Sequence, residues 1–177
     1  MKRAANSKVV VIDSCVAIGA SRTKSPSSRS RQVLQGIISA DHKVCWSKAL
    51  RKEWTENQAN FALQWLSTMV AKKKFIFLKD EDIDQNPALA EGIERKLKKK
   101  SEKEAANKDA FLINMALKAD RVVFSYDDVA RNLFIIVSEG YNELEKVMWI
   151  NPKEREDILS VLEDGIPVEN KSLLKIT

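Results

Sequence analysis

Aspartates follow two apolar segments of this chain at the points where the segments end. Asp13 comes directly after the run Val9 to Ile12, and Asp127 comes two residues after the segment 121–125. Short runs of β-branched and aromatic residues such as these predict buried strands. Because ligands gather outside the carboxyl ends of parallel strands, we expect both carboxylates to lie at one edge of a sheet.

Two carboxylates at neighbouring strand ends repel each other, because like charges within about 6 Å oppose ionisation. A hard divalent cation removes this conflict, and Mg²⁺ or Mn²⁺ prefers carboxylate oxygens and water as ligands. The chain has a single histidine, His42, and two cysteines, Cys15 and Cys45, without CxxC spacing. The pattern therefore predicts bound Mg²⁺ or Mn²⁺ and gives no support to a zinc site.

Two further acids fit the same edge of the sheet. Glu53 lies in SKALRKEWTEN, one or two helical turns after the end of a predicted strand. Asp109 lies in ANKDAFLINMALKAD, early in the helix that leads to the segment 121–125. We take Asp13, Glu53, Asp109 and Asp127 as the candidate metal ligands and catalytic residues.

All four acids also have an ordinary structural interpretation. Asp127 and Asp128 could be the N-terminal cap and first turn of the helix that begins DDVARNLF. Asp13 could cap a turn after its strand. Glu56 shares a helix face with Glu53, and Glu104 lies five residues before Asp109. Either glutamate, like the acid it rivals, could be a solvated surface charge.

The elements that must position these acids alternate along the chain. Between the predicted strands lie segments with apolar residues at helical spacing, and such alternation predicts a parallel sheet covered on both faces. The fold class is therefore α/β, three-layer α/β/α with a central, mostly parallel four- or five-stranded sheet. The predicted strands are 9–12, 43–47, 74–79, 121–125 and 146–150, and the predicted helices are 31–40, one or two within 48–74, a pair that begins at Pro87 and breaks near Ser101, and 153–165.

Composition favours one soluble domain. The 177 residues are 44% hydrophobic and 31% charged, without a repeat or low-complexity tract. We expect a single domain over 1–177, with its core at about 8–150 and a strand–helix extension at 146–177. The net charge of +5 and the pI near 9.1 favour a polyanionic partner such as nucleic acid. Few cysteines, no membrane-length apolar run, and an N-terminal apolar run interrupted by Asp13 predict a cytoplasmic protein without a membrane partner.

The order of three segments carries a family resemblance. VVVIDSCVAIGA, then SKALRKEWTEN, then KDAFLINMALKADRVVFSYDD resembles the PIN domain family of metal-dependent nucleases over about residues 8–150. Members have an acid after the first strand, an acid in an early helix, an acid in the helix before the fourth strand, and a Thr/Ser-x-Asp after that strand. Here the last element is SYD, Ser125 to Asp127, and Cys15 stands where the family often has a polar residue.

The resemblance implies a function and partners. It implies a Mg²⁺- or Mn²⁺-dependent endoribonuclease that hydrolyses single-stranded RNA to 5′-phosphate products, as the toxin of a toxin–antitoxin module. RNA, an antitoxin protein and a second copy of the chain are the partners this implies. Two further functions fit the same residues: a nuclease of RNA processing or phage defence without an antitoxin, and a PIN-like RNA- or protein-binding module without catalysis. The chain lacks the nucleotide-binding motifs GxGxxG and GxxxxGK[ST].

The resemblance also assigns supporting roles. The S-x-D register favours Asp127 as the ligand, with Asp128 as a helix cap or supporting acid. Ser125 is expected to hold Asp13 or Asp127 by hydrogen bonding. The basic residues expected at the rim of the site, where they would attract phosphates, are Arg22, Lys24, Arg29 and Arg31, and the four tryptophans are expected in the core.

Overall fold

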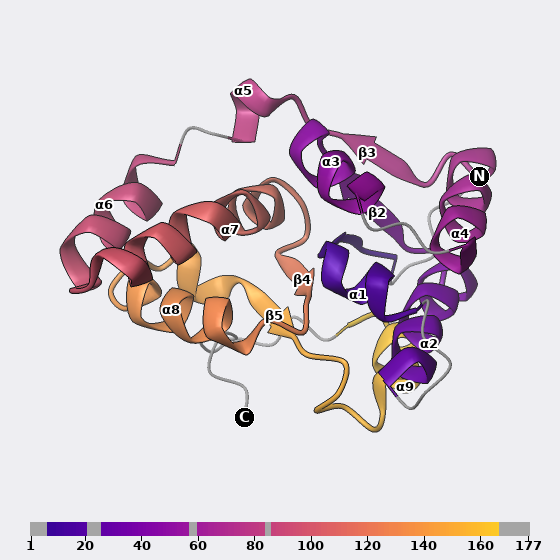
Figure 1. Ribbon diagram of the computed structural model, residues 1–177. Helices are drawn as coiled ribbons and strands as arrows, with labels where there is room; N and C mark the ends of the chain where they lie inside the picture. The colour runs from indigo at the N-terminus through magenta and orange to yellow at the C-terminus, as the bar shows by residue number, and fades with distance from the viewer. Residues whose placement is uncertain (1–6, 21–25, 57–59, 84–85, 167–177) are drawn as a thin grey trace.

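The structure, a computed structural model, describes residues 7–20, 26–56, 60–83 and 86–166. Its centre is a five-stranded sheet in which every pair of neighbours is parallel (Figure 1). The strand order is β3-β2-β1-β4-β5. This confirms the predicted fold class and sets the number of strands at five. The strands are β1 (Val9–Ile12), β2 (Lys43–Trp46), β3 (Phe75–Phe77), β4 (Val122–Phe124) and β5 (Met148–Ile150).

Helices cover both faces of the sheet. In Figure 1, α6, α7 and α8 lie together on one side, whereas α1, α2, α4 and α9 lie on the other. The helix bounds are α1 (Ser14–Gly19), α2 (Pro26–Ser39), α3 (Lys48–Glu56), α4 (Asn60–Ala71), α5 (Asp80–Ile83), α6 (Pro87–Lys96), α7 (Lys100–Lys118), α8 (Asp128–Ser138) and α9 (Ile158–Glu163). No helix in these ranges is both long and apolar enough to cross a membrane.

The strand order reverses between β1 and β4. The chain runs outward from β1 through β2 to β3, then returns to place β4 on the other side of β1. Ile12 pairs with Phe124 at the carboxyl ends of β1 and β4. In open parallel sheets the crevice beyond such a reversal is where ligands bind. Asp13 and Ser125, the residues that follow these two strands, therefore face the favoured position.

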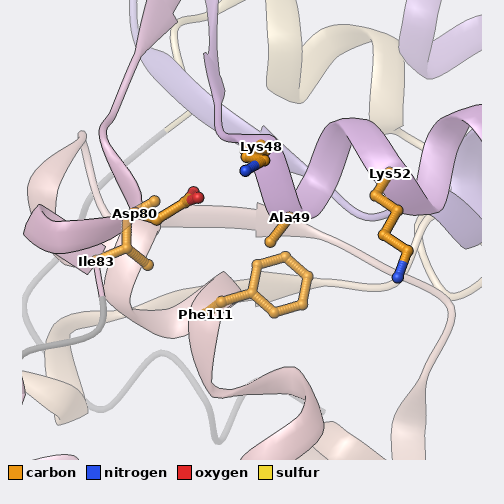
Figure 2. A pocket seen from close by; sticks show the side chains of 6 residues that line it. All are labelled: Lys48, Ala49, Lys52, Asp80, Ile83 and Phe111. Carbon is orange, nitrogen blue, oxygen red and sulfur yellow. The ribbon is translucent and has the colours of Figure 1, made fainter.

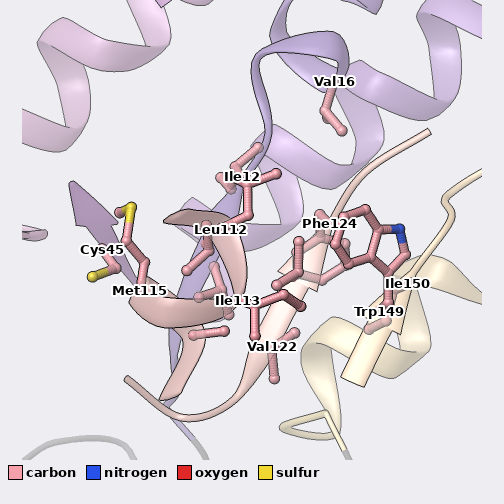
Figure 3. Packing of buried hydrophobic residues seen from close by; sticks show 14 of the residues in the cluster. Ile12, Val16, Cys45, Leu112, Ile113, Met115, Val122, Phe124, Trp149 and Ile150 are labelled. Carbon is pink, nitrogen blue, oxygen red and sulfur yellow. The ribbon is translucent and has the colours of Figure 1, made fainter. Parts of the chain in front are cut away.

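The core explains why these apolar runs became strands. Val10, Val11 and Ile12 of β1 are fully buried, as expected of a central strand covered by helices on both faces. Figure 3 shows Leu112 of α7 in the same buried cluster as Ile12 of β1 and Phe124 of β4. Buried hydrophobic residues from Val9 to Ile166 form one cluster, so the described part of the extension at 146–177 completes the core.

All four tryptophans are buried, as predicted. Trp54 of α3 lies edge-on to Trp46, with ring centroids 5.2 Å apart, and stacks on Trp65 at 5.8 Å. The Trp54 indole Nε1 donates a hydrogen bond to the Ile12 carbonyl oxygen at 3.1 Å. This bond ties α3 to the residue that precedes Asp13.

Several boundaries differ from the predicted ones. Helix α2 begins at Pro26 and not at Arg31, because proline suits the first helical turn, where its missing N–H is not needed. Helix α9 begins at Ile158 and not near Lys153, because turns precede it: Asn151 Oδ1 accepts a bond from the Lys153 backbone N–H at 3.0 Å. The break between α6 and α7 falls at 97–99, just before the predicted position.

Candidate functional site: an acidic cluster at the carboxyl edge of the sheet

Asp13 is buried and held from several sides. Its side chain is 8% exposed, and it caps α1 through a bond from the Cys15 backbone N–H to Oδ1 at 3.4 Å. Its other oxygen, Oδ2, accepts a bond from Ser125 Oγ at 2.6 Å. Asp13 is therefore both a helix cap and a fixed carboxylate at the reversal of strand order.

Ser125 connects the ends of β1 and β4. Its hydroxyl donates to Asp13 and accepts a bond from the Asp127 backbone N–H at 3.0 Å. The prediction that Ser125 holds Asp13 or Asp127 is confirmed for both residues. A fully buried hydroxyl with two partners of this kind fixes the relative positions of the two acidic segments.

Cys15 lies two residues after Asp13, at the position where members of the PIN domain family often have a polar residue. Its Sγ lies 3.0 Å from Asp13 Oδ2. Burial, and then the charge of Asp13, raise the pKa of the thiol far above its usual value. Cys15 thus remains a protonated donor to the carboxylate.

Glu53 approaches Asp13 from α3. Ser14 Oγ lies 3.2 Å from both Asp13 Oδ1 and Glu53 Oε2, so the hydroxyl can donate to either carboxylate. Burial, followed by the charge of Asp13, raises the pKa of Glu53. The structure therefore brings together two acids that are 40 residues apart in the sequence.

Asp109 completes the group from α7. Its pKa is raised to about 6, first by burial, against the opposing charge of Lys108, and further by Asp13, Asp127 and Glu53. The charge of each of the other three candidate acids thus raises the pKa of Asp109. Asp109 is therefore within electrostatic reach of the other three acids, and the Ser14 hydroxyl links Asp13 to Glu53 directly.

The structure separates Asp127 from Asp128. Asp127 caps α8, because its Oδ1 accepts a hydrogen bond from the Ala130 backbone N–H at 2.8 Å. The charge of Asp127 also raises the pKa of Asp109. Asp128 instead accepts two bonds from Asn151 Nδ2, at 2.9 and 3.0 Å, at the end of β5. Its carboxylate is committed to the turn after β5, which leaves Asp127 as the member of the cluster.

The two rival glutamates and the histidine lie outside the cluster. Glu104 pairs with Lys100 on the exposed face of α7, with 3.7 Å between Oε1 and Nζ. Glu56 is exposed and only weakly raises the pKa of Glu53. His42 is buried with both ring nitrogens occupied: Nδ1 accepts from the Lys8 backbone N–H at 2.9 Å, and Nε2 lies 2.8 Å from the Leu162 carbonyl oxygen. These contacts give His42 a structural role.

The role expected of the basic residues at the rim stays a prediction. Arg29 Nη1 donates to the Glu156 carbonyl oxygen at 3.1 Å, and Arg31 Nε donates to that of Ala20 at 2.9 Å, so both hold α2 in place. Arg22 and Lys24 lie outside the described residues. Lys108, which the sequence pattern did not single out, lowers the pKa of both Asp109 and Glu53. Its position directly before Asp109 in the sequence was the signal that could have predicted a lysine near the cluster.

The chemistry of the cluster suits a hard cation. Its donors are carboxylate and hydroxyl oxygens, which Mg²⁺ and Mn²⁺ prefer, and the one imidazole of the chain is used elsewhere. In the ranges that the structure describes, however, no group of three or more His, Cys, Asp or Glu side chains is arranged to hold an ion as it stands.

The fold and this site together define an α/β protein with an all-parallel sheet and a group of acids around the buried Asp13 at the reversal of strand order. A search of protein-family models and a search of curated protein sequences found no match to the chain.

Proposed function

We propose that this protein is a Mg²⁺- or Mn²⁺-dependent endoribonuclease that hydrolyses phosphodiester bonds of single-stranded RNA. The observation that carries the proposal is the set of contacts around Asp13 at the ends of β1 and β4: Ser14 links it to Glu53, and Ser125 links it to the Asp127 backbone. The charges of these three acids also act on Asp109. Like charges grouped around the buried Asp13 oppose folding, so their grouping calls for a functional reason.

Each residue of the site has its own proposed role. Asp13, Asp109 and Asp127 would contact the metal directly or through water, and Glu53 would serve a second ion or orient the attacking water. A bound ion of this kind lowers the pKa of water and offsets charge on the reacting phosphate. Ser125 positions Asp13 and Asp127. Lys108 is placed to contact a substrate phosphate, which the uncompensated carboxylates would repel.

The resemblance to the PIN domain family extends the proposal to a biological role. It favours the toxin of a toxin–antitoxin module, cytoplasmic, with an antitoxin and a second copy of the chain as partners. A nuclease of RNA processing or phage defence would use the same residues without an antitoxin. Growth arrest on expression that Asp13→Asn abolishes would favour the toxin.

A second candidate is an RNA-binding module of the same fold without catalysis. The net charge of +5 suits RNA binding whether or not the carboxylates hold an ion.

Hydrolysis of labelled single-stranded RNA tests the proposal. We expect the purified chain to cut with Mn²⁺ or Mg²⁺, to leave 5′-phosphate ends, and to be inactive in EDTA. Asp13→Asn should abolish cleavage, whereas Glu104→Gln, a solvated acid on the same helix as Asp109, should keep it. Cleavage that persists in EDTA and in Asp13→Asn would refute metal catalysis, and no cleavage under any condition would favour the binding module.

Asp128 supplies a further test of the assignment of the two adjacent aspartates. Asp128→Ala is expected to lower the free energy of unfolding by about 1–3 kcal/mol, because the buried Asn151 amide loses its acceptor. Its rate of RNA hydrolysis per folded molecule should stay within about twofold of the parent, since Asp128 lies outside the cluster. Chemical denaturation and the cleavage assay measure the two effects. A loss of activity as large as that of Asp127→Ala would reverse the assignment.

A further inference from the structure

β3 is an edge strand that exposes apolar side chains. It lies at one end of the strand order β3-β2-β1-β4-β5, with β2 as its neighbour in the sheet (Figure 1). Its three residues are Phe75, Ile76 and Phe77. Phe77 is 69% exposed and Ile76 is 36% exposed, although both belong to the central sheet. An edge with large exposed apolar side chains is a surface that can pair with another strand.

The backbone groups of Phe75 and Phe77 point outward, away from β2. The carbonyl oxygen of Lys74 and the N–H of Leu78 each bond to the backbone of β2, both at 2.8 Å. Successive residues of a strand direct their N–H and C=O groups to opposite sides. The groups of residues 74, 76 and 78 therefore face β2, and those of Phe75 and Phe77 face the outer edge.

The rings of β3 continue an aromatic row on one face of the sheet. The Phe75 ring centroid lies 5.1 Å from that of Trp46 and 6.0 Å from that of Phe77. Trp46 is buried and Phe75 is half-buried, so the row runs from the core to the exposed Phe77 ring at the edge. Side chains directly opposite each other in an antiparallel pair lie on the same face and contact each other. A second Phe77 opposite the first therefore extends the row and removes both rings from water.

Opposite charges lie at the two ends of β3. Two exposed lysines precede the strand and two exposed acids follow it: Lys72, Lys73, Glu81 and Asp82. Asp80, which also follows the strand, instead lines a cavity of about 410 Å³ together with Lys48 and Phe111 (Figure 2). The strand is therefore flanked by a basic end and an acidic end.

We propose that β3 pairs antiparallel with β3 of a second copy of this chain, in the register that places Phe77 opposite Phe77. Antiparallel pairing sets the lysines before one strand against the acids after the other, twice around the two-fold axis, whereas parallel pairing sets lysine against lysine. Centring the pair on Ile76 would bring Lys73 beside Lys79, and like charges placed opposite each other are destabilising. Centring it on Phe77 places Lys79 opposite the Phe75 ring, which attracts a cation.

The pairing keeps the two acidic clusters apart. Strands are antiparallel across the interface, so the carboxyl ends of the strands in one copy lie on the side of the amino ends in the other. Asp13 follows β1, and β2 lies between β1 and β3 in the sheet. None of the candidate catalytic residues takes part, so this inference stands or falls separately from the proposed function.

Sedimentation velocity of the full chain in EDTA tests the interface. We expect a monomer at about 1 µM and mostly dimer at about 100 µM, because so short a strand buries less than the roughly 1,200–2,000 Å² of stable complexes. Phe77→Lys should weaken dimerisation roughly tenfold or more, since it sets two like charges opposite each other. Val129→Lys is the matched control: Val129 is 68% exposed but lies on α8, so this variant should dimerise like its parent.

Charge reversal tests the antiparallel register. Lys72→Glu together with Lys73→Glu should weaken dimerisation roughly tenfold, because two acidic ends then meet. Adding Glu81→Lys and Asp82→Lys to the same chain should restore the dissociation constant to within about threefold of the parent value. Restoration requires that opposite ends of the two strands meet, which a purely hydrophobic contact does not. Circular dichroism checks that each variant is folded.

A parent chain that stays monomeric at about 100 µM would overturn self-pairing and would assign the edge to a strand of another protein. A dimer that Phe77→Lys leaves unchanged would place the interface elsewhere and would also overturn the proposal. Loss of the dimer on the first charge reversal, without recovery on the second, would refute the antiparallel register. The parent measurement needs no variant, and no measurement uses RNA, so a failure of the proposed nuclease leaves these outcomes unchanged.

Discussion

Replacing Asp109 with asparagine is expected to lower Mn²⁺-dependent hydrolysis of single-stranded RNA roughly 1,000-fold, or about 4 kcal/mol of transition-state stabilisation. Asparagine keeps the size of the side chain but removes the charge that would hold the metal. Single-turnover cleavage of a labelled RNA measures the rate. Glu104→Gln on the same helix is the matched control, and a variant that retains more than about a tenth of the rate would exclude Asp109 from catalysis.

The same substitution is expected to stabilise the metal-free protein. The pKa of Asp109 is raised from its ordinary value of 3.8 to about 6, chiefly by burial, so its charge opposes folding above pH 6. Because Asp109 is partly exposed, solvent screens this penalty, and we expect a gain of about 1–2 kcal/mol for Asp109→Asn at pH 7 in EDTA.

The sign of the pH dependence follows from the direction of the shift. A raised pKa means that the folded state binds the proton more tightly, so the penalty fades as the pH falls from about 7 toward 4. The difference in stability between the variant and its parent should therefore shrink over that range. Comparing the two proteins cancels the opposite contribution of His42, whose pKa burial lowers. Thermal unfolding at pH 7 and pH 4.5 measures the difference, and a variant less stable than its parent at pH 7 would contradict this account.

Trp54→Ala is expected to lower the free energy of unfolding by about 3–5 kcal/mol. Trp54 is 3% exposed and lies between Trp46 and Trp65, with ring centroids 5.2 and 5.8 Å away. Alanine would leave a cavity among these rings and would remove the hydrogen bond to the Ile12 carbonyl oxygen. Denaturant unfolding followed by circular dichroism measures the loss.

Trp54→Phe is the control that separates the contribution of the indole hydrogen bond from that of the aromatic ring. It keeps an aromatic side chain but leaves the Ile12 carbonyl oxygen without its indole donor, so we expect a smaller loss of about 1–3 kcal/mol. The Ile12 carbonyl immediately precedes Asp13, and Trp54 follows Glu53. A loss below about 1 kcal/mol for the alanine variant would show that the three tryptophans contribute little to the core.

The local sequence pattern was sufficient to predict the strands and the acids that follow them. A run such as Val9 to Ile12 buries all its side chains only as an interior strand, which its β-branched residues favour over a helix. In an all-parallel sheet every strand ends at the same edge, and the pairing of β1 with β4 makes the strand ends before Asp13 and Asp127 neighbours. The sequence by itself therefore determined the fold class and the edge at which the acids lie, whereas the strand order decided which of the strand ends are neighbours.

Contacts between distant segments decided the rest. Asn151, 23 residues after Asp128, binds that carboxylate, so only the pairing of β4 with β5 could separate Asp128 from Asp127. Arg29 Nη1 donates to a carbonyl group 127 residues away, a contact that no local pattern predicts. Asp80 of α5 and Phe111 of α7 line one cavity, although they belong to different helices and share no sequence motif. Hydrogen bonding and burial depend on which segments meet in space, and a one-dimensional pattern does not contain that information.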